Sequence, residues 1–230
     1  MTDKADKGWR KVPVLKEGAF GDGPREERSD AAESRRRILR AARELFGERG
    51  VDVVSMHEIG RAADVGQGTL YRRFEHKGAL CSALLRERVE RFSEEVRARL
   101  EDEGEPALER IAWLLDRLAD FTEKNAPLLG AIRDAAGGER RTEVYRSPFY
   151  GWLRACVVAL LWRAVERDEA LSDLDVECAA DAVLAPLNID LYLFQRHELG
   201  MEPERITVAL RRLLLDGLRV ATPGGDARNV

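Results

Sequence analysis

Residues 55–80 read SMHEIGRAADVGQGTLYRRFEHKGAL, and the capping and turn residues in this stretch indicate short helices separated by a tight turn. Ser55 and Glu58 have the spacing of a capping box, in which each side chain bonds the backbone N–H of the other residue. A short helix is therefore expected from Met56 to about Ala63. The tripeptide Asp64-Val65-Gly66 ends this helix, because Asp and Gly tolerate turn conformations that helix interiors disfavour.

A second short helix is predicted from Gln67 to Phe74, directly after the turn. A longer amphipathic helix precedes both, because apolar residues from Ile38 to Phe46 recur at i, i+3, i+4, i+7 and i+8, up to the stop signal at Gly50. A helix, a tight turn and a second helix, backed by a third, form a helix-turn-helix unit, whose second helix lies in the DNA major groove. An ordinary αα-hairpin of a helical bundle is the alternative.

The second helix of this unit keeps a polar outward face. Hydrogen-bonding side chains of these kinds read base edges and hold phosphates. Gly68 lowers helix propensity by about 1 kcal/mol relative to alanine, and in return it permits close backbone approach to a partner. The outward side chains are Gln67, Thr69, Tyr71, Arg72 and Arg73.

The rest of the chain shows helical periodicity, which predicts an all-α fold with about nine helices. Apolar residues repeat at helical spacing from Leu85 to Leu100, from Leu108 to Ala119 and from Ile206 to Leu218, and no segment shows convincing strand alternation. Helix breaks are expected at Gly104 to Pro106, near Pro127, at Gly137-Gly138 and around Ser172.

Charge is unevenly distributed along the chain, whose formal net charge is −4. Residues 28–80 hold eleven basic and eight acidic side chains, whereas residues 81–230 hold 21 and 28. A basic segment attached to an acidic body lets one end approach nucleic acid. Chance unevenness in an arginine-rich chain is the alternative.

Nothing in the sequence indicates membrane insertion or export. The longest apolar run, Ala155 to Trp162, has eight residues, whereas a spanning helix needs about twenty. The short apolar stretch from Val12 to Leu15 does not resemble a signal-peptide core. The three cysteines form no C-x-x-C pair, which indicates a reducing compartment and argues against a disulfide framework or a zinc finger. We therefore expect a cytoplasmic protein without a membrane partner, in which Cys156 and Cys178 are buried within apolar helices.

Small and apolar residues recur at fixed spacings between about Ser34 and Leu80: Ile38-x-x-Ala41-Ala42-x-x-Leu45-Phe46-x-x-x-Gly50, Ser55-Met56-x-x-Ile59 and Ala63-x-Val65-x-x-Gly68-Thr69-Leu70-Tyr71-x-x-Phe74-x-x-Lys77-x-x-Leu80. This pattern resembles the tetracycline-repressor (TetR) family of bacterial transcriptional regulators. The resemblance implies that Gln67 and Gly68 face bases. It implies that phosphates are held by Ser55, Thr69, Tyr71, Arg72, Arg73 and Lys77. The core it implies consists of Ile38, Ala42, Leu45, Phe46, Ile59, Val65, Leu70 and Phe74.

The sequence departs from the family pattern at four positions of the helix-turn-helix. Asp64 stands where the family most often has Gly, Gly66 where Ser usually caps the recognition helix, Gly60 where Ala is usual, and Arg73 where His or Tyr is common. Without the Ser side chain the recognition helix is less stable by roughly 0.5 to 1 kcal/mol unless another group caps it, although Gly is a tolerated N-cap. Arg73 adds a bidentate donor for a phosphate or for a guanine edge.

The resemblance also implies a larger helical domain that binds a small effector and forms a homodimer through its last two long helices. The expected division is a mobile arm at 1–33, the DNA-binding domain at 34–80, the effector-binding and dimerisation domain at 81–222 and a flexible tail at 223–230. Helices that are apolar on several sides agree with this, because a core, a partner subunit or a ligand must cover them. Candidate effector contacts, for each of which ordinary packing or solvation is the alternative, are Trp113, Phe121, Asn125, Arg133, Phe149, Trp152, Leu153, Cys156, Asn188 and Tyr192.

Two segments near the C-terminus offer small and branched residues on two faces, as a four-helix dimer seam requires. Packing within one subunit is the alternative. A two-fold dimer would present two recognition helices to a palindromic double-stranded DNA site, with half-sites about 34 to 36 Å apart or a multiple of this. The candidate interface residues are Ala179, Ala182, Val183, Pro186, Ile206, Leu210, Leu213, Leu214, Gly217 and Leu218.

No enzyme motif is recognised, because the sequence has no H-E-x-x-H, no Walker loop and no nucleophile elbow. We therefore predict no catalytic residue, metal ligand or cofactor. The predicted function is a sequence-specific transcriptional regulator, a repressor that a small apolar or amphipathic effector releases from its operator. The alternatives are an activator or an effector-independent DNA binder of the same fold and, more remotely, a helical enzyme with an unrecognised site.

Overall fold

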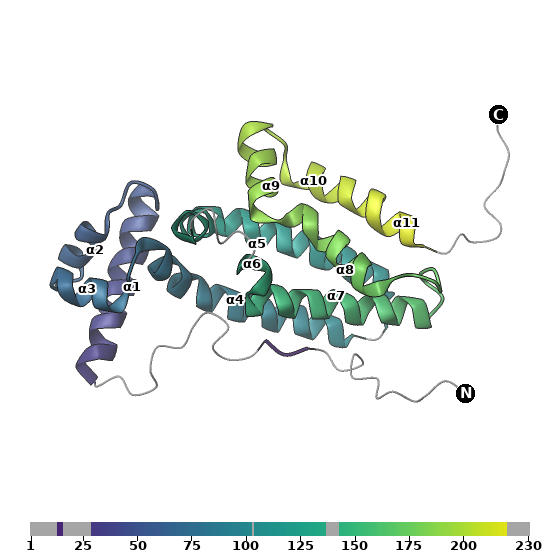
Figure 1. Cartoon of the computed structure of the whole chain (residues 1–230), viewed down its shortest axis with the longest axis horizontal. Coiled ribbons are helices and arrows are strands. Elements are labelled where there is room, and N and C mark those ends of the chain that lie inside the picture. The colour runs from purple at the N-terminus through teal and green to yellow at the C-terminus, as the bar shows by residue number, and fades with distance from the viewer. Residues whose placement is uncertain (1–12, 16–28, 103, 137–142, 220–230) are drawn as a thin grey trace. The chain divides into compact units, whose positions relative to one another are not determined.

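The structure, a computed structural model, describes residues 13–15, 29–102, 104–136 and 143–219 (Figure 1). Every regular segment in these ranges is helical, apart from one isolated bridge between Ala170 and Arg219, so the predicted all-α class is confirmed for the described residues. The tail expected at 223–230 and most of the expected arm lie outside them. The helices are α1 Ser29–Arg49, α2 Met56–Ala62, α3 Gln67–Arg73, α4 Lys77–Glu101, α5 Ala107–Ala136, α6 Glu143–Arg146, α7 Pro148–Glu166, α8 Val176–Leu184, η3 Ala185–Leu187, α9 Ile189–Leu193, η4 Phe194–Glu198, α10 Pro203–Leu210, η5 Arg211–Leu215 and α11 Asp216–Leu218.

The three helices of the helix-turn-helix unit form where the sequence predicts them. α2 and α3 begin at Met56 and Gln67, the predicted residues. α1 ends before Gly50, whose φ of +87° lies in the left-handed region that glycine adopts without a Cβ clash. The buried core of the unit includes Ile38, Ala42, Ile59, Leu70 and Phe74. The expected core residues that keep part of their surface exposed are Leu45, Phe46 and Val65.

α1 is longer than its apolar stripe. It begins at Ser29, so residues 29–33 are helical, and the prediction that they belong to a mobile arm is wrong. Its first turn contains Asp30, whose negative charge is favourable at a helix N-terminus, and the Ser34 hydroxyl donates to the Asp30 carbonyl at 2.8 Å. A pattern that counts only apolar residues does not detect such polar turns. The domain boundary at residue 34 stays a prediction.

α5 continues without a break through Pro127, so the helix end predicted near this proline is wrong. Proline removes one backbone N–H and crowds the carbonyl four residues earlier, which destabilises a helix interior by about 3 kcal/mol. The neighbouring residues Asn125 and Leu128 are buried, and the Asn125 side chain donates to the Phe121 carbonyl at 2.7 Å. Packing of these residues therefore outweighs the local preference of proline.

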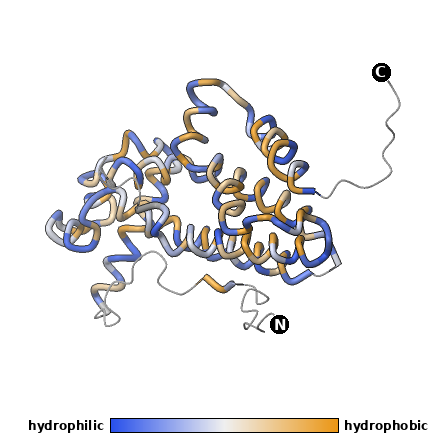
Figure 2. The backbone as a smooth tube through the Cα atoms, turned by 45° about the vertical axis from the view of Figure 1, so that its right-hand side comes forward, coloured by the Kyte–Doolittle hydropathy of each residue, from blue (hydrophilic) through white to orange (hydrophobic). Residues whose placement is uncertain are grey.

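The described residues belong to two compact units. Within the described ranges, the N-terminal unit contains residues 14–95 and 121–152, and the C-terminal unit contains residues 96–120 and 153–219 together with residue 13. α4, α5 and α7 each contribute residues to both units. Figure 2 shows hydrophobic and hydrophilic residues alternating along most helices, as expected for helices with one buried face. The expected domain division after residue 80 stays a prediction.

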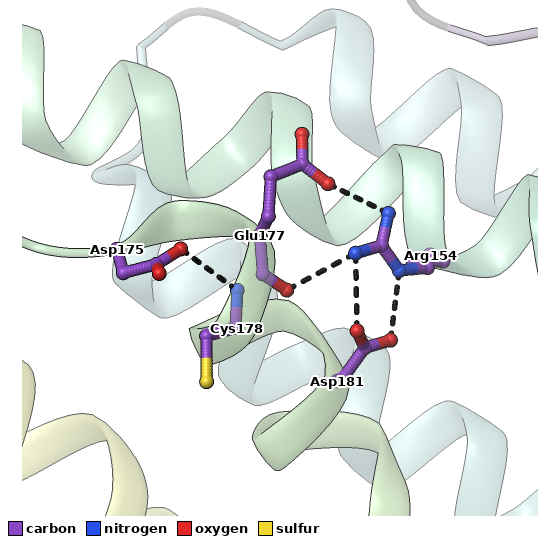
Figure 3. A network of polar contacts seen from close by, with 5 residues as sticks. All are labelled: Arg154, Asp175, Glu177, Cys178 and Asp181. Atoms are coloured by element: carbon purple, nitrogen blue, oxygen red, sulfur yellow. Dashed lines mark hydrogen bonds and ion pairs between the residues drawn. The ribbon is translucent and has the colours of Figure 1, made fainter.

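α7 and α8 of the C-terminal unit are joined through one arginine (Figure 3). Arg154 on α7 donates to both carboxylate oxygens of Asp181, at 2.7 and 3.0 Å, and to Glu177 Oε2 at 2.7 Å. Hydrogen bonds to Asp181 first, and then to Glu177, raise the pKa of Arg154 above its usual value. Such bidentate, charge-assisted contacts restrict the orientation of the two helices.

Cys178 is exposed on the first turn of α8, so the expectation that it is buried is wrong. The buried residues Val176 and Ala180 lie two positions to either side of it. Because a helix turns by about 100° per residue, Cys178 points away from the face that they share. Cys156 on α7 is buried as predicted, and burial raises the pKa of its thiol to about 12.

α7 contains the longest apolar run of the chain and buries most of it. Leu160 and Leu161 are fully buried, whereas Trp162 is 38% exposed. The next residue, Arg163, donates to the Leu100 carbonyl near the end of α4 at 2.9 Å. Among the described residues, no helix combines the length and the apolar character that a membrane span requires.

Candidate nucleic-acid interface

A capping box begins α2, as the sequence predicts. The Ser55 hydroxyl accepts from the Glu58 N–H at 3.2 Å, and the Glu58 carboxylate accepts from the Ser55 N–H at 2.8 Å. The same carboxylate accepts from Arg49, the last residue of α1, at 2.7 Å. The Ser55 backbone bond, followed by the Ser55 hydroxyl and Arg49, lowers the pKa of Glu58 from 4.5 to about 2. The start of α2 is thereby attached to the end of α1.

The turn between α2 and α3 is held by an arginine of α1. Asp64 has a φ of +50°, in the left-handed region that only a few residue types tolerate. Arg37 donates to the Ala63 carbonyl through Nη2 at 2.6 Å and through Nε at 3.0 Å, and its Nη2 lies 2.9 Å from Asp64 Oδ2. Sequence reasoning missed Arg37, because nothing distinguishes it from the two arginines that precede it.

α3 begins without a side-chain cap. Its N-cap residue, Gly66, has a φ of −64° and offers no side chain to the free N–H groups of the helix, as its sequence predicts. A Cβ at Gly66 or at Gly68 would meet no other atom within 4 Å. Gly68 is also exposed. The backbone of α3 is therefore accessible at Gly68, the position predicted to approach DNA closely.

All eight residues predicted to contact DNA keep some exposed surface. Arg72 Nη2 donates to Thr69 Oγ1 at 3.3 Å, so these two side chains are neighbours on α3. Lys77 is the first residue of α4, and its Nζ donates to the Asp52 carbonyl at 3.1 Å. The exposed residues are Ser55, Gly68, Tyr71 and Arg72, and the half-buried ones are Gln67, Thr69, Arg73 and Lys77. Contact with DNA stays a prediction for each of them.

A short polar helix, preceded by a tight turn and backed by two further helices, is the arrangement with which helix-turn-helix proteins enter the major groove. α1, α2 and α3 have this arrangement, and the accessible end of α3 carries hydrogen-bonding groups rather than apolar ones. Fold and site together define a DNA-binding protein of the helix-turn-helix class.

Similar sequences agree with this class. Residues 38–84 match the family model described as bacterial regulatory proteins, tetR family. An HTH-type transcriptional regulator of Staphylococcus aureus (strain bovine RF122 / ET3-1) is 29% identical over 189 residues, which cover 82% of this chain and 96% of that protein. Another HTH-type transcriptional regulator, from S. aureus (strain USA300), is 34% identical over 123 residues, which cover 54% of this chain and 64% of that protein.

Solved structures show the same architecture. Thermus thermophilus FadR, a TetR-family transcriptional repressor in complex with lauroyl-CoA, is 26% identical with a TM-score of 0.62, covering 83% of this chain and 100% of that one. Bacillus subtilis FadR in complex with stearoyl-CoA is 18% identical with a TM-score of 0.58, covering 80% and 99%, and supports the fold alone. Residues 38–84 therefore match the helix-turn-helix of the tetR family of bacterial regulatory proteins, and the chain is similar along most of its length to DNA-binding transcriptional regulators.

Three of the predicted effector contacts meet in one group of rings within the N-terminal unit. The Phe92 ring centroid lies 4.8 Å from that of Phe121, 6.0 Å from that of Phe149 and 6.2 Å from that of Trp152. Phe149 and Trp152 are stacked at 5.8 Å. We call these four residues the aromatic cluster. Sequence reasoning missed Phe92, because it lies on the apolar stripe of α4, where nothing separates it from ordinary core residues.

Two polar candidates lie on the C-terminal part of α5. Asn125 is buried, and its amide nitrogen donates to the Phe121 carbonyl at 2.7 Å while its oxygen accepts from Arg88 at 2.6 Å. Arg133 is exposed and lies 2.8 Å from the Asp134 carboxylate. Asn125 therefore links α4 to α5 inside the N-terminal unit, and Arg133 belongs to the surface of α5.

The other effector candidates belong to the C-terminal unit. Asn188 caps α9, because its side-chain oxygen accepts from the Asp190 N–H at 3.0 Å. The Arg99 guanidinium lies 5.7 Å from the centroid of the Trp113 ring, within the range of a cation–π contact. The buried candidates are Leu153, Cys156 and Tyr192. The contacts of Asn188 and Trp113 stabilise the helices on which these residues lie. A role toward an effector stays a prediction for all five residues.

The residues predicted to form a dimer interface lie on α8, η3 and the helical segment from α10 to α11. Among them, Val183 and Ile206 are buried, whereas Leu213 is 76% exposed. Ala182, Leu213 and Gly217 are exposed, and Ala179, Pro186, Leu210, Leu214 and Leu218 are half-buried. The same C-terminal segments expose further large apolar side chains, namely Leu191, Phe194 and Leu199.

Proposed function

We propose that the protein is a homodimeric repressor that binds a palindromic operator and releases it when a small amphipathic effector binds. In this proposal residues 34–80 form the DNA-binding domain and residues 81–222 the effector-binding and dimerisation domain. The observation that carries the DNA part is the accessible polar face of α3. The proposal includes no catalytic step, since the matched relatives are named transcriptional regulators. Binding to chromosomal DNA implies a cytoplasmic protein.

The proposed contacts divide into two kinds. Gln67 and Gly68 face bases, because the N-terminal residues of a recognition helix contact base edges. Arg72 and Lys77 hold phosphates, because cations near the ends of the recognition element contact the DNA backbone. The remaining proposed phosphate contacts are Ser55, Thr69, Tyr71 and Arg73. Exposed or half-exposed positions support these assignments for all eight residues.

Selection of bound duplexes from a random DNA pool tests the operator proposal. We expect a palindromic consensus, and sequence-independent binding alone would contradict it. With the consensus in hand, Arg72→Ala should weaken binding to consensus and random DNA alike and reduce the dependence of affinity on salt. Gln67→Ala should instead relax discrimination at one base pair per half-site. Equal losses on both kinds of DNA for both variants would contradict the division of roles.

We propose that the effector is amphipathic and that its apolar part is an acyl chain. The aromatic cluster offers four rings, and Arg88 with Asn125 offers polar groups in the same unit, a combination typical of sites for amphipathic ligands. The solved FadR that is 26% identical to this chain carries lauroyl-CoA. An acyl-CoA is therefore the ligand class that we propose first.

Titration of the protein–operator complex with lauroyl-CoA, coenzyme A and lauric acid tests this class, with a fluorescent duplex reporting release. We expect release by the acyl-CoA and a weaker response to either of its parts. Phe149→Ala should reduce the response without changing operator affinity. Trp162→Ala, which alters an exposed ring on the same helix, is the matched control. Failure of all three ligands would contradict the acyl-CoA class, and an unchanged response in Phe149→Ala would contradict the role of the cluster.

The homodimer proposal is supported by the apolar side chains exposed near the C-terminus. Leu213 is a large apolar residue with 76% of its surface exposed, and burying such surface drives association. Sedimentation equilibrium should show a dimer for the unmodified chain and a shift toward monomer for Leu213→Asp. Arg212→Gln, which also makes the net charge one unit more negative and lies at the exposed neighbouring position, controls for the change in charge. A dimer that is equally stable in both variants would remove Leu213 from the interface.

A further inference from the structure

Gly60 leaves room for the Gln67 side chain on the surface of α2. A Cβ at Gly60 would lie 2.6 Å from Gln67 Nε2 and 3.5 Å from Gln67 Cδ. The distance to Nε2 is too short for non-bonded atoms, so the end of the Gln67 amide occupies space that the Cβ of any other residue at position 60 would fill. Gly60 is buried in α2, where glycine is a poorer helix former than alanine. Room for the amide is what the structure gains from glycine at this position.

The amide has further contacts in this space. Gln67 Nε2 donates to the His57 carbonyl at 3.4 Å, and Leu70 Cδ2 lies 3.3 Å from the Cβ position at Gly60. The Gln67 side chain is consequently half-buried, although Gln67 is the first residue of α3. We call Gly60, the His57 carbonyl and Leu70 the Gln67 seat.

Gln67 cannot occupy the seat and read a base at the same time. Glutamine reads adenine with both its amide oxygen and its amide nitrogen, whereas the seated nitrogen is directed to α2. Base reading therefore requires the side chain to leave the seat. When only part of a population is competent to bind, the apparent affinity is lowered by that fraction. The contacts that Gln67 makes with α2 thus compete with its contact to the base.

We propose that Gly60 is a specificity-determining position, because seating Gln67 on α2 weakens the reading of one base pair in each half-site. This inference rests on the proposed base contact of Gln67. Gly60→Ala fills the seat with a methyl group and turns the amide outward, since the nearest atom, Gln67 Nε2, is the end of a flexible side chain, whereas Leu70 Cδ2 at 3.3 Å has to yield by only a few tenths of an ångström. Discrimination at that base pair then rises by about two- to tenfold, the range expected for one hydrogen bond. Gly60 is a positioning residue that itself touches no base.

The test measures the affinity of four proteins for the consensus duplex and for duplexes in which each base pair of the half-site is replaced in turn. The proteins are the unmodified chain, Gly60→Ala, Gln67→Ala and the double variant. We expect Gly60→Ala to sharpen discrimination at a single base pair and to have no effect on discrimination when Gln67 is already alanine. Unchanged discrimination in Gly60→Ala, or the same change in the absence of Gln67, overturns the inference.

A second measurement follows the seat directly and does not depend on a folded variant. Nuclear Overhauser contacts between the Gln67 side-chain amide and the Gly60 Hα protons are expected in the free, isotope-labelled protein and should disappear when the consensus duplex is added. Their absence from the free protein, or their persistence in the complex, overturns the inference. If Gln67→Ala changes discrimination at no base pair, the proposed base contact itself fails, whereas the contacts in the free protein still report on the seat.

Discussion

Arg37 on α1 contacts Asp64, the residue with left-handed backbone in the turn between α2 and α3. The guanidinium lies 2.9 Å from the Asp64 carboxylate and also donates to the carbonyls of Asp64 and Ala63. The Asp64 side chain is 99% exposed, so the ion pair itself contributes little. The bonds to the carbonyls matter more, because a cation is favourable at a helix C-terminus. One side chain of α1 therefore restricts the turn from which α3 begins.

Removing this contact should loosen the turn. We expect Arg37→Ala to lower the free energy of unfolding by about 1 to 2 kcal/mol, the range for charge-assisted hydrogen bonds and for a cation at a helix end. Operator affinity should fall as well, because α3 is less well positioned. Urea denaturation and binding to a labelled duplex measure the two effects. The control is Arg36→Ala, whose exposed ion pair with Glu33 should contribute less than about 0.5 kcal/mol. Equal destabilisation by both variants would contradict the role of Arg37.

A serine at position 66 should stabilise α3. The φ of −64° and the open surroundings of Gly66 accept a side chain, and a serine hydroxyl could accept from a free N–H of the first turn. We expect Gly66→Ser to raise the free energy of unfolding by about 0.3 to 0.5 kcal/mol, because glycine is only slightly poorer than serine as an N-cap. Gly66→Ala offers no acceptor and should not stabilise. If alanine stabilises as much as serine, capping is not the cause.

The capping box should make the free energy of unfolding depend on pH in the acidic range. Hydrogen bonds from Ser55, and then Arg49, lower the pKa of Glu58 from 4.5 to about 2 in the folded protein. A lowered folded-state pKa means that the ionised group stabilises the fold above about pH 4.5, and that this contribution is lost as the pH falls toward 2. Glu58→Gln should therefore be less stable than the unmodified protein at neutral pH, and the difference should narrow below pH 4.5. A difference that stays constant down to about pH 3 would contradict this.

The three thiols should differ in reactivity. Burial raises the pKa of Cys81 to about 11 and that of Cys156 to about 12, whereas Cys178 is exposed. Because the thiolate is the reactive species, a disulfide reagent at about pH 8 should modify one thiol rapidly and the other two only as the protein unfolds. Cys178→Ser should remove the rapid phase. Rapid modification of more than one thiol would show that the helices around Cys81 or Cys156 open to the reagent in the folded protein.

Local features of the sequence were sufficient to predict α2 and α3. The capping pair Ser55 and Glu58, the turn residue Asp64 and the apolar period of α1 act on backbone within a few residues, so their consequences can be derived from spacing alone. The same reasoning predicted that α1 ends at Gly50. It failed at Pro127, where a local preference for a helix break is weaker than the packing of Asn125 and Leu128 on either side.

Other features of the site depend on residues that are far apart in the chain. Arg37 reaches the Ala63 carbonyl across 26 positions, and Phe92 joins the aromatic cluster with residues of α5 and α7. Gln67 shows the limit most clearly, because its place at the start of α3 follows from the sequence whereas its position over Gly60 depends on how α3 packs against α2. The helices of this unit and the residue types on their surfaces follow from the sequence, since periodicity and capping are local. The directions in which Arg37 and Gln67 point were decided only when separate segments came together, because Arg37 is directed by carbonyls of the turn after α2 and Gln67 by a carbonyl of α2.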